Sequence, residues 1–334
     1  MNRTQSAPVC VIVAAKDASC TIGRAIRSAL DAPQVGEVVV IDDGSRDDTA
    51  RVAQDCEDGT GRLHVVRFTE NRGPASARNS ALRISRSPLI AVLDADDFFL
   101  KGRFDQLLAG DDWDFAADNI LFSDSGDRTL SVPAFMPEPS LISLADFVAG
   151  NMIRRGRPRG ELGFLKPVMR RSFLERHGLG YDESLRLGED YDLYARALMR
   201  GARFRVVRTC GYGAVVRSGS LSGRHDTADL LRLWGADQAL LSDPEMPRPS
   251  REVIAAHARQ VRARYELRRF LDIKRENGLG AAARHVLTRP AALPAIAGGV
   301  LGDKLRDRIG SGRPAKAGQA VPRCLLPGRL AMSD

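Results

Sequence analysis

The first hundred residues alternate between short apolar runs and longer segments in which apolar residues recur every three or four positions. Apolar runs rich in branched residues predict strands that are buried on both faces. The spacing of three or four predicts amphipathic helices. The resulting order β-α-β-α-β-α-β implies a doubly wound α/β domain with a parallel sheet and right-handed crossovers. The expected strands cover residues 9–15, 38–41, 63–68 and 89–93, and the expected helices cover residues 21–30, 49–56 and 73–84.

The strand at residues 89–93 runs directly into three carboxylates, Asp94, Asp96 and Asp97. Open α/β sheets bind ligands at the carboxyl ends of their strands. Carboxylates packed this closely repel one another unless a cation lies among them, and Mg2+ and Mn2+ are hard cations that also bind phosphate oxygens. The cluster therefore predicts a divalent metal site. The alternative is a helix start that is capped by Asp97.

The strand at residues 38–41 also ends in acidic residues, Asp42 and Asp43, which are followed by Gly44 and Ser45. A carboxylate here can accept hydrogen bonds from a uracil N–H group or from ribose hydroxyls, and Gly44 allows a tight turn. The chain has no GxGxxG fingerprint after its first strand and no GxxxxGK[ST] loop, which excludes the dinucleotide-binding and P-loop classes. The turn is the best candidate for a nucleotide site; the alternative is an acidic turn that caps the next helix.

Two later segments carry further acidic candidates. Residues 113–123 alternate like a strand with Asp118 in the middle, and this side chain either binds an acceptor hydroxyl or faces solvent. Residues 188–198 predict a helix with Glu189 and Asp190 in its first turn, near the positive end of the helix dipole. Stabilisation of that dipole is the alternative to a catalytic role.

Four motifs occur in an order and spacing that resembles family 2 glycosyltransferases of the GT-A fold, and the pattern is most similar to the bacterial exopolysaccharide, succinoglycan-type subgroup. The motifs are Asp42-Asp43-Gly44-Ser45, Asn71-Arg72-Gly73-Pro74 with Ala77-Arg78-Asn79, Leu93-Asp94-Ala95-Asp96-Asp97, and Gly188-Glu189-Asp190-Tyr191-Asp192-Leu193. The resemblance covers residues 8–220. It implies an inverting transfer of a sugar, glucose by the habit of the subgroup, from a UDP-linked donor to a saccharide or a polyprenyl-linked acceptor.

The resemblance also implies a role for each motif residue. Asp190 matches the catalytic base, which takes the proton from the acceptor hydroxyl as that oxygen attacks the anomeric carbon, so that one displacement gives inversion. Asp96 is expected to hold Mg2+ or Mn2+ on the diphosphate, with His225 as a candidate further metal ligand. The expected nucleotide-sugar contacts are Ala14, Ala15, Asp42, Asp43, Arg78, Asp94 and Arg217. The expected acceptor contacts are Asp118, Lys166 and Glu189.

One motif departs from the family pattern. The first strand commonly ends in Pro-x-Tyr-Asn in this family, whereas here it ends in Ala14-Ala15-Lys16-Asp17. The small residues can keep the backbone contact to the base, but the aromatic residue near the base is missing. Processive members also carry a Gln-x-x-Arg-Trp motif and membrane helices. The chain contains neither pattern, which indicates an enzyme that adds one sugar at a time.

Charge divides the chain into two parts. The 334 residues have a net charge of +8, but residues 246–334 hold 18 Lys or Arg against 7 Asp or Glu, which leaves a net charge of −3 on residues 1–245. Apolar residues between 253 and 271 are spaced for an amphipathic helix with an Arg-rich face, and residues 279–309 form a second such region. These helices can rest on an anionic membrane that carries a polyprenyl-linked acceptor; the alternative is packing against the catalytic domain or another subunit.

The expected organisation is a transferase domain at residues 8–225, a basic helical extension at residues 226–309 and a disordered tail at residues 310–334. The five cysteines are scattered without a CxxC pair, as expected in a reducing cytosol. The sequence shows neither a signal-peptide pattern at its start nor an apolar run of 18 residues. We therefore expect a cytoplasmic protein that either is free or lies peripherally on the cytoplasmic face of the inner membrane.

Three other classes fit part of the pattern. A sugar-phosphate nucleotidyltransferase also uses paired carboxylates on an α/β sheet, but it normally carries a Gly-rich, basic loop after the first strand. A catalytically inactive nucleotide-sugar binder has the same motifs as an active enzyme. A nucleic-acid-binding protein is disfavoured because the chain has no recognised module and its positive charge is confined to the tail, so nucleic acid is not an expected partner.

Overall fold

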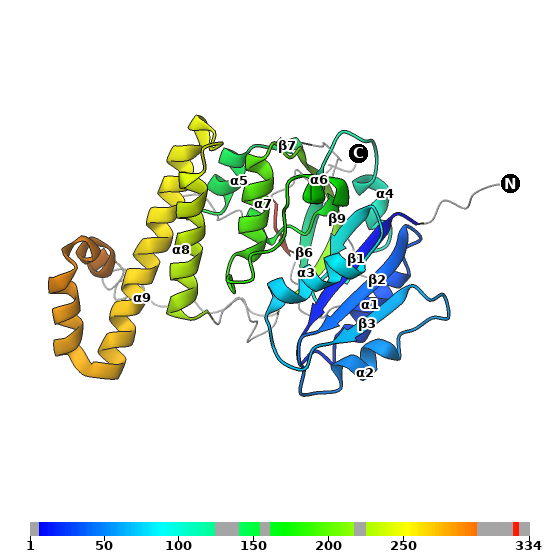
Figure 1. Cartoon of the computed structure of the whole chain (residues 1–334), viewed down its shortest axis with the longest axis horizontal. Coiled ribbons are helices and arrows are strands. Elements are labelled where there is room, and N and C mark those ends of the chain that lie inside the picture. The colour runs from blue at the N-terminus through cyan, green and yellow to red at the C-terminus, as the bar shows by residue number, and fades with distance from the viewer. Residues whose placement is uncertain (1–6, 124–139, 154–160, 217–224, 299–322, 327–334) are drawn as a thin grey trace, which may run out of the picture. The chain divides into compact units, whose positions relative to one another are not determined.

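A computed structural model describes residues 7–123, 140–153, 161–216, 225–298 and 323–326 (Figure 1). The chain divides into two compact units. The first comprises residues 1–220 and 322–334, and the second comprises residues 221–321. The boundary at residue 220 lies close to the end of the predicted transferase domain.

The first unit is built on one sheet. Its described strands are β1 (Val9–Ala15), β2 (Val35–Asp42), β3 (Leu63–Arg67), β4 (Leu89–Val92), β5 (Phe98–Phe99), β6 (Phe115–Ser123), β7 (Ser140–Ile142), β8 (Val168–Arg170), β9 (Phe204–Val215) and β10 (Arg323–Cys324). Their order is β3-β2-β1-β4-β8-β6-β9-β5, with β10 beside β6 and β7 beside β9. The first four strands pair in parallel, as predicted. Strand β8 runs antiparallel to both β4 and β6, so the complete sheet is mixed.

Helices cover this sheet. They are α1 (Ile22–Leu30), α2 (Thr49–Gln54), α3 (Pro74–Ile84), α4 (Arg103–Leu107), α5 (Leu144–Gly150), the 3-10 turn η1 (Leu162–Phe164), α6 (Arg171–Arg176) and α7 (Glu189–Met199). The predicted helices at residues 21–30, 49–56, 73–84 and 188–198 correspond to α1, α2, α3 and α7. Pro74 occupies the first turn of α3, where its missing N–H group costs no hydrogen bond.

Both faces of the parallel strands are buried, which explains their continuous apolar sequence. Val9, Val11 and Val13 pack in one cluster with the apolar stripe of α1. Cys10 and Ile12 point to the opposite face, because side chains alternate along a strand, and they are also fully buried. Strands β1, β2 and β4 are thereby held rigidly, and the residues that follow their carboxyl ends form the candidate site.

The second unit consists of helices α8 (Thr227–Ser242) and α9 (Arg248–Thr288), followed by the 3-10 turn η3 (Pro290–Ala292). The Asp229 carboxylate accepts a hydrogen bond from the backbone N–H of Asp226 and so caps α8. Helix α9 breaks at Gly278, whose φ of 80° is non-helical. Among the described residues, no helix is both long enough and apolar enough to cross a membrane.

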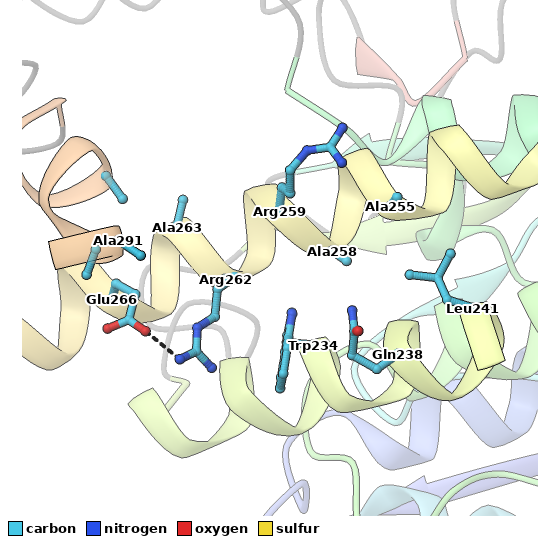
Figure 2. Close-up of a pocket in the computed structure, with 12 residues that line it drawn as sticks. Trp234, Gln238, Leu241, Ala255, Ala258, Arg259, Arg262, Ala263, Glu266 and Ala291 are labelled. Carbon is cyan, nitrogen blue, oxygen red and sulfur yellow. Dashed lines mark ion pairs between the residues drawn. The ribbon is translucent and has the colours of Figure 1, made fainter. Parts of the chain in front are cut away.

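A cavity of about 440 Å3 lies within the second unit, between α8, α9 and η3 (Figure 2). Its walls are Trp234 and several alanines, and the Arg262 guanidinium lies 4.8 Å from the centre of the Trp234 ring. Arg262 also pairs with Glu266 at 2.6 Å. The interior of the helical unit is therefore partly polar, although most of its lining side chains are apolar.

The structure differs from the sequence prediction near the C-terminus. Residues 310–334 were expected to be disordered, but Arg323 and Cys324 form β10, which pairs antiparallel with β6. The Asn119 side chain reinforces this pairing, since it accepts from the backbone N–H of Leu326 at 2.7 Å and donates to the Leu326 carbonyl at 3.0 Å. A segment that follows the helical unit in sequence thus belongs to the sheet of the first unit.

Candidate active site

The carboxyl ends of β1, β2 and β3 surround a cavity of about 900 Å3. The residues that line it include Lys16 after β1, Gly44 and Ser45 after β2, and Arg67 and Phe68 at the end of β3. Gly44 has a φ of +67°, and a Cβ atom there would lie 2.6 Å from the backbone carbon of Glu70. Only glycine fits this turn, because both its dihedral angle and the close approach of the next loop exclude a side chain.

Asp42 and Asp43 are both buried beneath this cavity. Asp42 accepts from the backbone N–H of Ser45 at 3.0 Å, and its other oxygen lies 3.4 Å from Nε of Arg67. Asp43 accepts from the backbone N–H groups of Arg72 and Gly73, at 2.6 and 2.8 Å. Both carboxylates therefore stabilise the loops that form the cavity wall by hydrogen bonds to backbone N–H groups, and Asp43 fixes the start of α3.

Four charged side chains form a closed ring of ion pairs at the carboxyl end of β4, which Asp94 follows. Arg78 of α3 donates to Asp94 at 2.8 Å and to Asp190 at 3.3 Å. Lys166 lies 3.1 Å from Asp94 and 2.7 Å from Asp190. Each carboxylate gives one oxygen to each cation. We call Arg78, Asp94, Lys166 and Asp190 the ionic ring; Glu189 adds a contact of 3.0 Å to Arg78.

Burial and charge act against each other within the ionic ring. Burial alone would raise the pKa of Asp94, but the adjacent Lys166 and Arg78 charges hold it at about 2. Burial alone would lower the pKa of Lys166, but the carboxylates of Asp190 and Asp94 raise it above its usual value. Asp94 and Lys166 are therefore both charged at neutral pH. The most accessible corner of the ionic ring is Asp94, whose side chain is 32% exposed, against 12% for Asp190 and 7% for Lys166.

The three carboxylates after β4 have different environments. Asp97 accepts from the Tyr212 hydroxyl and from the backbone N–H of Val215, and burial together with the Asp94 and Asp96 charges raises its pKa to about 7. Asp94 belongs to the ionic ring, whereas Asp96 is half-buried beside it. Within the described part of the chain, no group of three or more His, Cys, Asp or Glu side chains could hold a metal ion.

This donor set fits an ion that arrives with a phosphate ligand. Mg2+ is commonly bound by only one or two carboxylates, with substrate phosphates and water completing its shell. Asp96 supplies one half-buried carboxylate of this kind, two residues after Asp94. A metal bound by protein side chains alone does not fit the described residues.

Comparison with known proteins identifies the family. A sequence model described as Glycosyl transferase family 2 matches residues 10–151. The chain is 57% identical over 317 residues to the succinoglycan biosynthesis protein ExoU of Rhizobium meliloti (strain 1021), and the match covers 93% of each chain. The protein belongs to glycosyl transferase family 2.

Further matches agree with this assignment. The chain is 33% identical over 294 residues to the succinoglycan biosynthesis protein ExoO of Rhizobium meliloti (strain 1021), covering 85% of this chain and 82% of the relative. The crystal structure of S. aureus TarS 1-349 in complex with UDP-GlcNAc superposes with a TM-score of 0.57 at 19% identity, over 86% of this chain and 81% of that chain.

A mannosyltransferase structure from Pyrobaculum calidifontis, PcManGT in complex with GDP-Man and Mn2+, gives a TM-score of 0.51 at 19% identity and covers 90% of this chain and 81% of that chain. At this level of identity the two structures share the fold with the present glycosyltransferase. The predicted GT-A fold is thereby confirmed.

Sequence reasoning missed several side chains that line the cavity at the ends of β1, β2 and β3, among them Lys16, Arg67 and Phe68. Phe68 is notable because the aromatic residue expected after β1 is absent from the sequence. The Arg72 guanidinium lies 4.9 Å from the centre of the Phe68 ring. Lys16 and Phe68 directly follow strands and Arg67 is the last residue of one, so the rule that ligands bind at the carboxyl ends of strands also applies to these three residues.

Asp118 lies in a different environment from the one expected for an acceptor contact. Its side chain is 1% exposed, and Arg103 donates to both of its oxygens at 3.0 to 3.3 Å. Gly211 leaves room for this pair, because a Cβ atom there would lie 2.4 Å from Asp118. Arg103 also donates to the Lys166 carbonyl at 2.6 Å. Asp118 is thus a buried counterion for Arg103, which in turn contacts the backbone of Lys166 in the ionic ring.

Three remaining predictions are placed as follows. Ala14 and Ala15 end β1, and the Ala15 carbonyl accepts from the backbone N–H of Asp43 at 2.8 Å. Arg217 lies outside the described residues. His225 is half-buried and precedes α8 in the second unit, so its role as a metal ligand stays a prediction.

Proposed function

We propose that this glycosyltransferase moves a sugar from a UDP-linked donor to a saccharide or lipid-linked acceptor, with inversion and one residue at a time, in the synthesis of a bacterial exopolysaccharide. The pathway and donor are supported by the names of its relatives, two of which are succinoglycan biosynthesis proteins. They are also supported by the fold shared with a UDP-GlcNAc complex. The single observation that carries the mechanism is the ionic ring.

The ionic ring holds the proposed donor-side carboxylate and the proposed base close together. Oxygens of Asp94 and Asp190 lie 3.1 and 2.7 Å from the same Lys166 nitrogen, so those two oxygens are within about 6 Å of each other. A base that hydrogen-bonds the attacking oxygen at about 3 Å, with that oxygen about 3 Å from the anomeric carbon, lies within about 6 Å of that carbon, so a sugar held by Asp94 is within reach of Asp190. Asp94 then contacts the donor sugar, and Asp190 faces the acceptor hydroxyl.

In this mechanism Asp190 accepts the proton of the acceptor hydroxyl while the hydroxyl oxygen attacks the anomeric carbon and the bond to the diphosphate oxygen breaks. No covalent enzyme intermediate forms, so the anomeric configuration inverts. Asp190 lies in the first turn of α7. Arg78 lies where it can also attract the negatively charged donor.

The cavity at the ends of β1, β2 and β3 is the proposed nucleotide site. Phe68 provides an aromatic face for the base, while Lys16 and Arg67 supply positive charge beside it. Asp42 and Asp43 act mainly by holding the surrounding loops, since the cavity wall depends on their hydrogen bonds to backbone N–H groups. Their direct contact with the nucleotide remains a proposal.

Asp96 is the residue that we propose as the protein ligand of Mn2+ or Mg2+. Such an ion neutralises charge that develops on the leaving diphosphate. Because the described residues offer no complete metal site, binding of the ion should depend on the nucleotide. Asp97 does not join this site in the proposal, because Tyr212 and Val215 already occupy its oxygens.

The helical unit is the proposed membrane-facing part of the molecule. Leu279, Leu287 and Leu293 are 66%, 80% and 52% exposed. They occur in a segment whose other residues include exposed Arg284 and Arg289. Exposed leucines among cations are typical of helices that lie in the interface of an anionic bilayer. Such contact would bring the enzyme to a polyprenyl-linked acceptor.

A panel of nucleotide sugars, assayed for nucleotide release with Mn2+ or Mg2+, tests the proposed function. UDP-sugars should be turned over, and product NMR should show an inverted anomeric configuration. Asp190→Asn should lower kcat by about 10² to 10⁴-fold because it removes general-base catalysis. The variant should keep its affinity for UDP in calorimetry.

Different results would point to the rival classes. Formation of a nucleotide sugar from a sugar phosphate and a nucleoside triphosphate would support a nucleotidyltransferase instead. Tight UDP-sugar binding without any turnover across acceptors would support an inactive binder. If Asp190→Asn abolished UDP binding as well as turnover, this residue would have a structural role and the proposed base would be wrong.

A further inference from the structure

The position of Lys166 between two carboxylates has a consequence beyond charge balance. Its ammonium group contacts the donor-side Asp94 and the base Asp190 simultaneously, at 3.1 and 2.7 Å. Arg78 makes the same pair of contacts from the opposite side. Neither carboxylate can therefore move or change its charge without affecting the cations that hold the other.

We propose that Lys166 is a positioning residue that sets the orientation and basicity of Asp190 and couples both to the occupancy of Asp94. This inference rests on the proposed function, in which Asp190 is the base. In the closed ring, both oxygens of Asp190 are engaged by cations. Asp94 is the most exposed member of the ring, and sugar hydroxyls that bind it change the strength of its ion pairs with Lys166 and Arg78. Because the same two cations pair with Asp190, their interaction with the base changes as well.

The surroundings of Lys166 are built to keep its side chain in place. Its backbone carbonyl accepts from Arg103, which is itself held by both oxygens of the buried Asp118. The Arg103 guanidinium lies 4.4 Å from the centre of the Phe99 ring. These contacts fix the backbone from which the Lys166 side chain extends, and the side chain itself is buried, with 7% exposed.

Several other groups face Asp190 and share its electrostatic environment. Glu189 precedes it on α7 and also contacts Arg78 at 3.0 Å. Tyr181 and Tyr194 are buried close enough that the Asp190 charge, after burial, contributes to raising their pKa values. Among these groups, Lys166 makes the shortest contact with Asp190 and can be removed without deleting a carboxylate.

The test is the pH profile of kcat for Lys166→Met. An opposite charge within about 4 to 6 Å typically lowers a carboxyl pKa by about 1 to 3 units. Loss of Lys166 should therefore move the acidic limb of the profile, where kcat falls as the pH is lowered, to higher pH by about 1 pH unit or more. We expect kcat at neutral pH to fall on the order of 100-fold, with the Kd for UDP changed by less than about threefold.

Two further variants give the inference distinct signatures. Lys166→Arg keeps the charge, so its acidic limb should stay near the wild-type position even if kcat falls. Asp94→Asn removes a competing carboxylate and leaves both cations to Asp190. Its acidic limb should therefore move downward, opposite to that of Lys166→Met. This variant also provides the test if Lys166→Met does not fold.

Arg171→Met is the matched control. Arg171 is a neighbouring cation that donates to the backbone carbonyls of Ser87 and Leu82 and makes no contact with the ionic ring. It should lower the Tm without moving the acidic limb. The inference would be overturned if the acidic limb of the kcat profile did not shift in Lys166→Met, or if it shifted equally in Lys166→Met and Arg171→Met.

The outcomes separate this inference from the proposed function. If Asp190→Asn is inactive while Lys166→Met and Asp94→Asn keep the wild-type profile, only the coupling role of Lys166 is wrong. If Asp190→Asn retains full turnover, the proposed base is wrong and the inference fails with it.

Discussion

Carboxylates of the same type have different roles at this site because their partners differ. Asp43 binds backbone N–H groups, Asp94 and Asp190 share two cations, and Asp97 accepts from a tyrosine hydroxyl. The pKa values of two of them differ accordingly, about 2 for Asp94 and about 7 for Asp97. Spacing in the sequence identifies the acidic cluster, whereas the contacts decide which member can meet a sugar, a metal or a proton.

Phe68 provides a prediction at the cavity. Phe68→Ala should weaken UDP binding by about 10-fold or more, since stacking of a base on an aromatic ring contributes about 1 to 3 kcal/mol. Calorimetry with UDP measures this effect. Phe122→Ala is the control, because Phe122 also lies beneath a guanidinium, that of Arg323 at 4.5 Å, but outside the cavity. Equal UDP affinity in wild type and Phe68→Ala would contradict base stacking.

Asp118 provides a second prediction at the residue scale. Asp118→Asn leaves the buried Arg103 without its counterion, which should lower the free energy of unfolding by about 3 to 5 kcal/mol. Urea denaturation measures this loss. The KM for the acceptor should change little in the fraction that is folded. A stable variant with a selectively raised acceptor KM would instead support the acceptor contact expected from the sequence.

At the scale of elements, sequence patterns predicted the parts of the sheet that are long and apolar. Strands β1 and β2 follow from continuous runs of branched residues, and α3 and α7 follow from helical spacing and motif position. Strands β5 and β8 contain only two and three residues, too few to show a period, and their places depend on pairing with distant segments. Two ion pairs depend on the same long-range topology: that of Arg103 with Asp118, and that of Lys166 with Asp190.

Glu37 connects two elements of the parallel sheet and gives a pH-dependent prediction. It lies on β2 and accepts from the backbone N–H groups of Arg86 and Ser87, just before β4. Burial would raise its pKa, but these hydrogen bonds outweigh burial and lower it. A depressed carboxyl pKa stabilises the fold above the unfolded pKa, and this contribution is lost as pH falls through the folded pKa.

Glu37→Gln should therefore reduce the free energy of unfolding by about 1 kcal/mol at pH 7, and the difference from wild type should shrink as the pH is lowered below about 4. Urea denaturation across this range measures it. The control is Glu57→Gln, because Glu57 accepts only from Gly59 and Gly61 within its own turn. A difference that grows on acidification would contradict the assigned sign.

At the scale of the whole molecule, the chain combines a nearly neutral transferase unit with a basic helical unit. The sequence predicted a basic helical extension from the charge and the helical spacing of residues beyond 245. It did not predict β10, because two residues in a segment rich in proline, glycine and cations carry no strand pattern. The return of the chain to β6 means that the sheet and the C-terminal segment must assemble together.

The basic helical unit gives a prediction about membrane association. Replacement of Leu279, Leu287 and Leu293 with serine should weaken binding to anionic vesicles by about 10-fold or more, because burial of a leucine contributes about 1.5 to 3 kcal/mol. Vesicle flotation measures this binding. The control replaces Leu141 and Ile153, which are 61% and 63% exposed in the first unit. Equal flotation of wild type and the triple variant would contradict the proposed membrane contact.

The most direct measurement is a crystal structure of the Asp190→Asn variant with an intact UDP-sugar and Mn2+. The account predicts Mn2+ at about 2.1 Å from an Asp96 oxygen and bound to the diphosphate. It also predicts the base on Phe68 and the residue 190 side chain within about 6 Å of the anomeric carbon. A diphosphate bound away from Asp96, or a residue 190 side chain more than about 10 Å from that carbon, would contradict it.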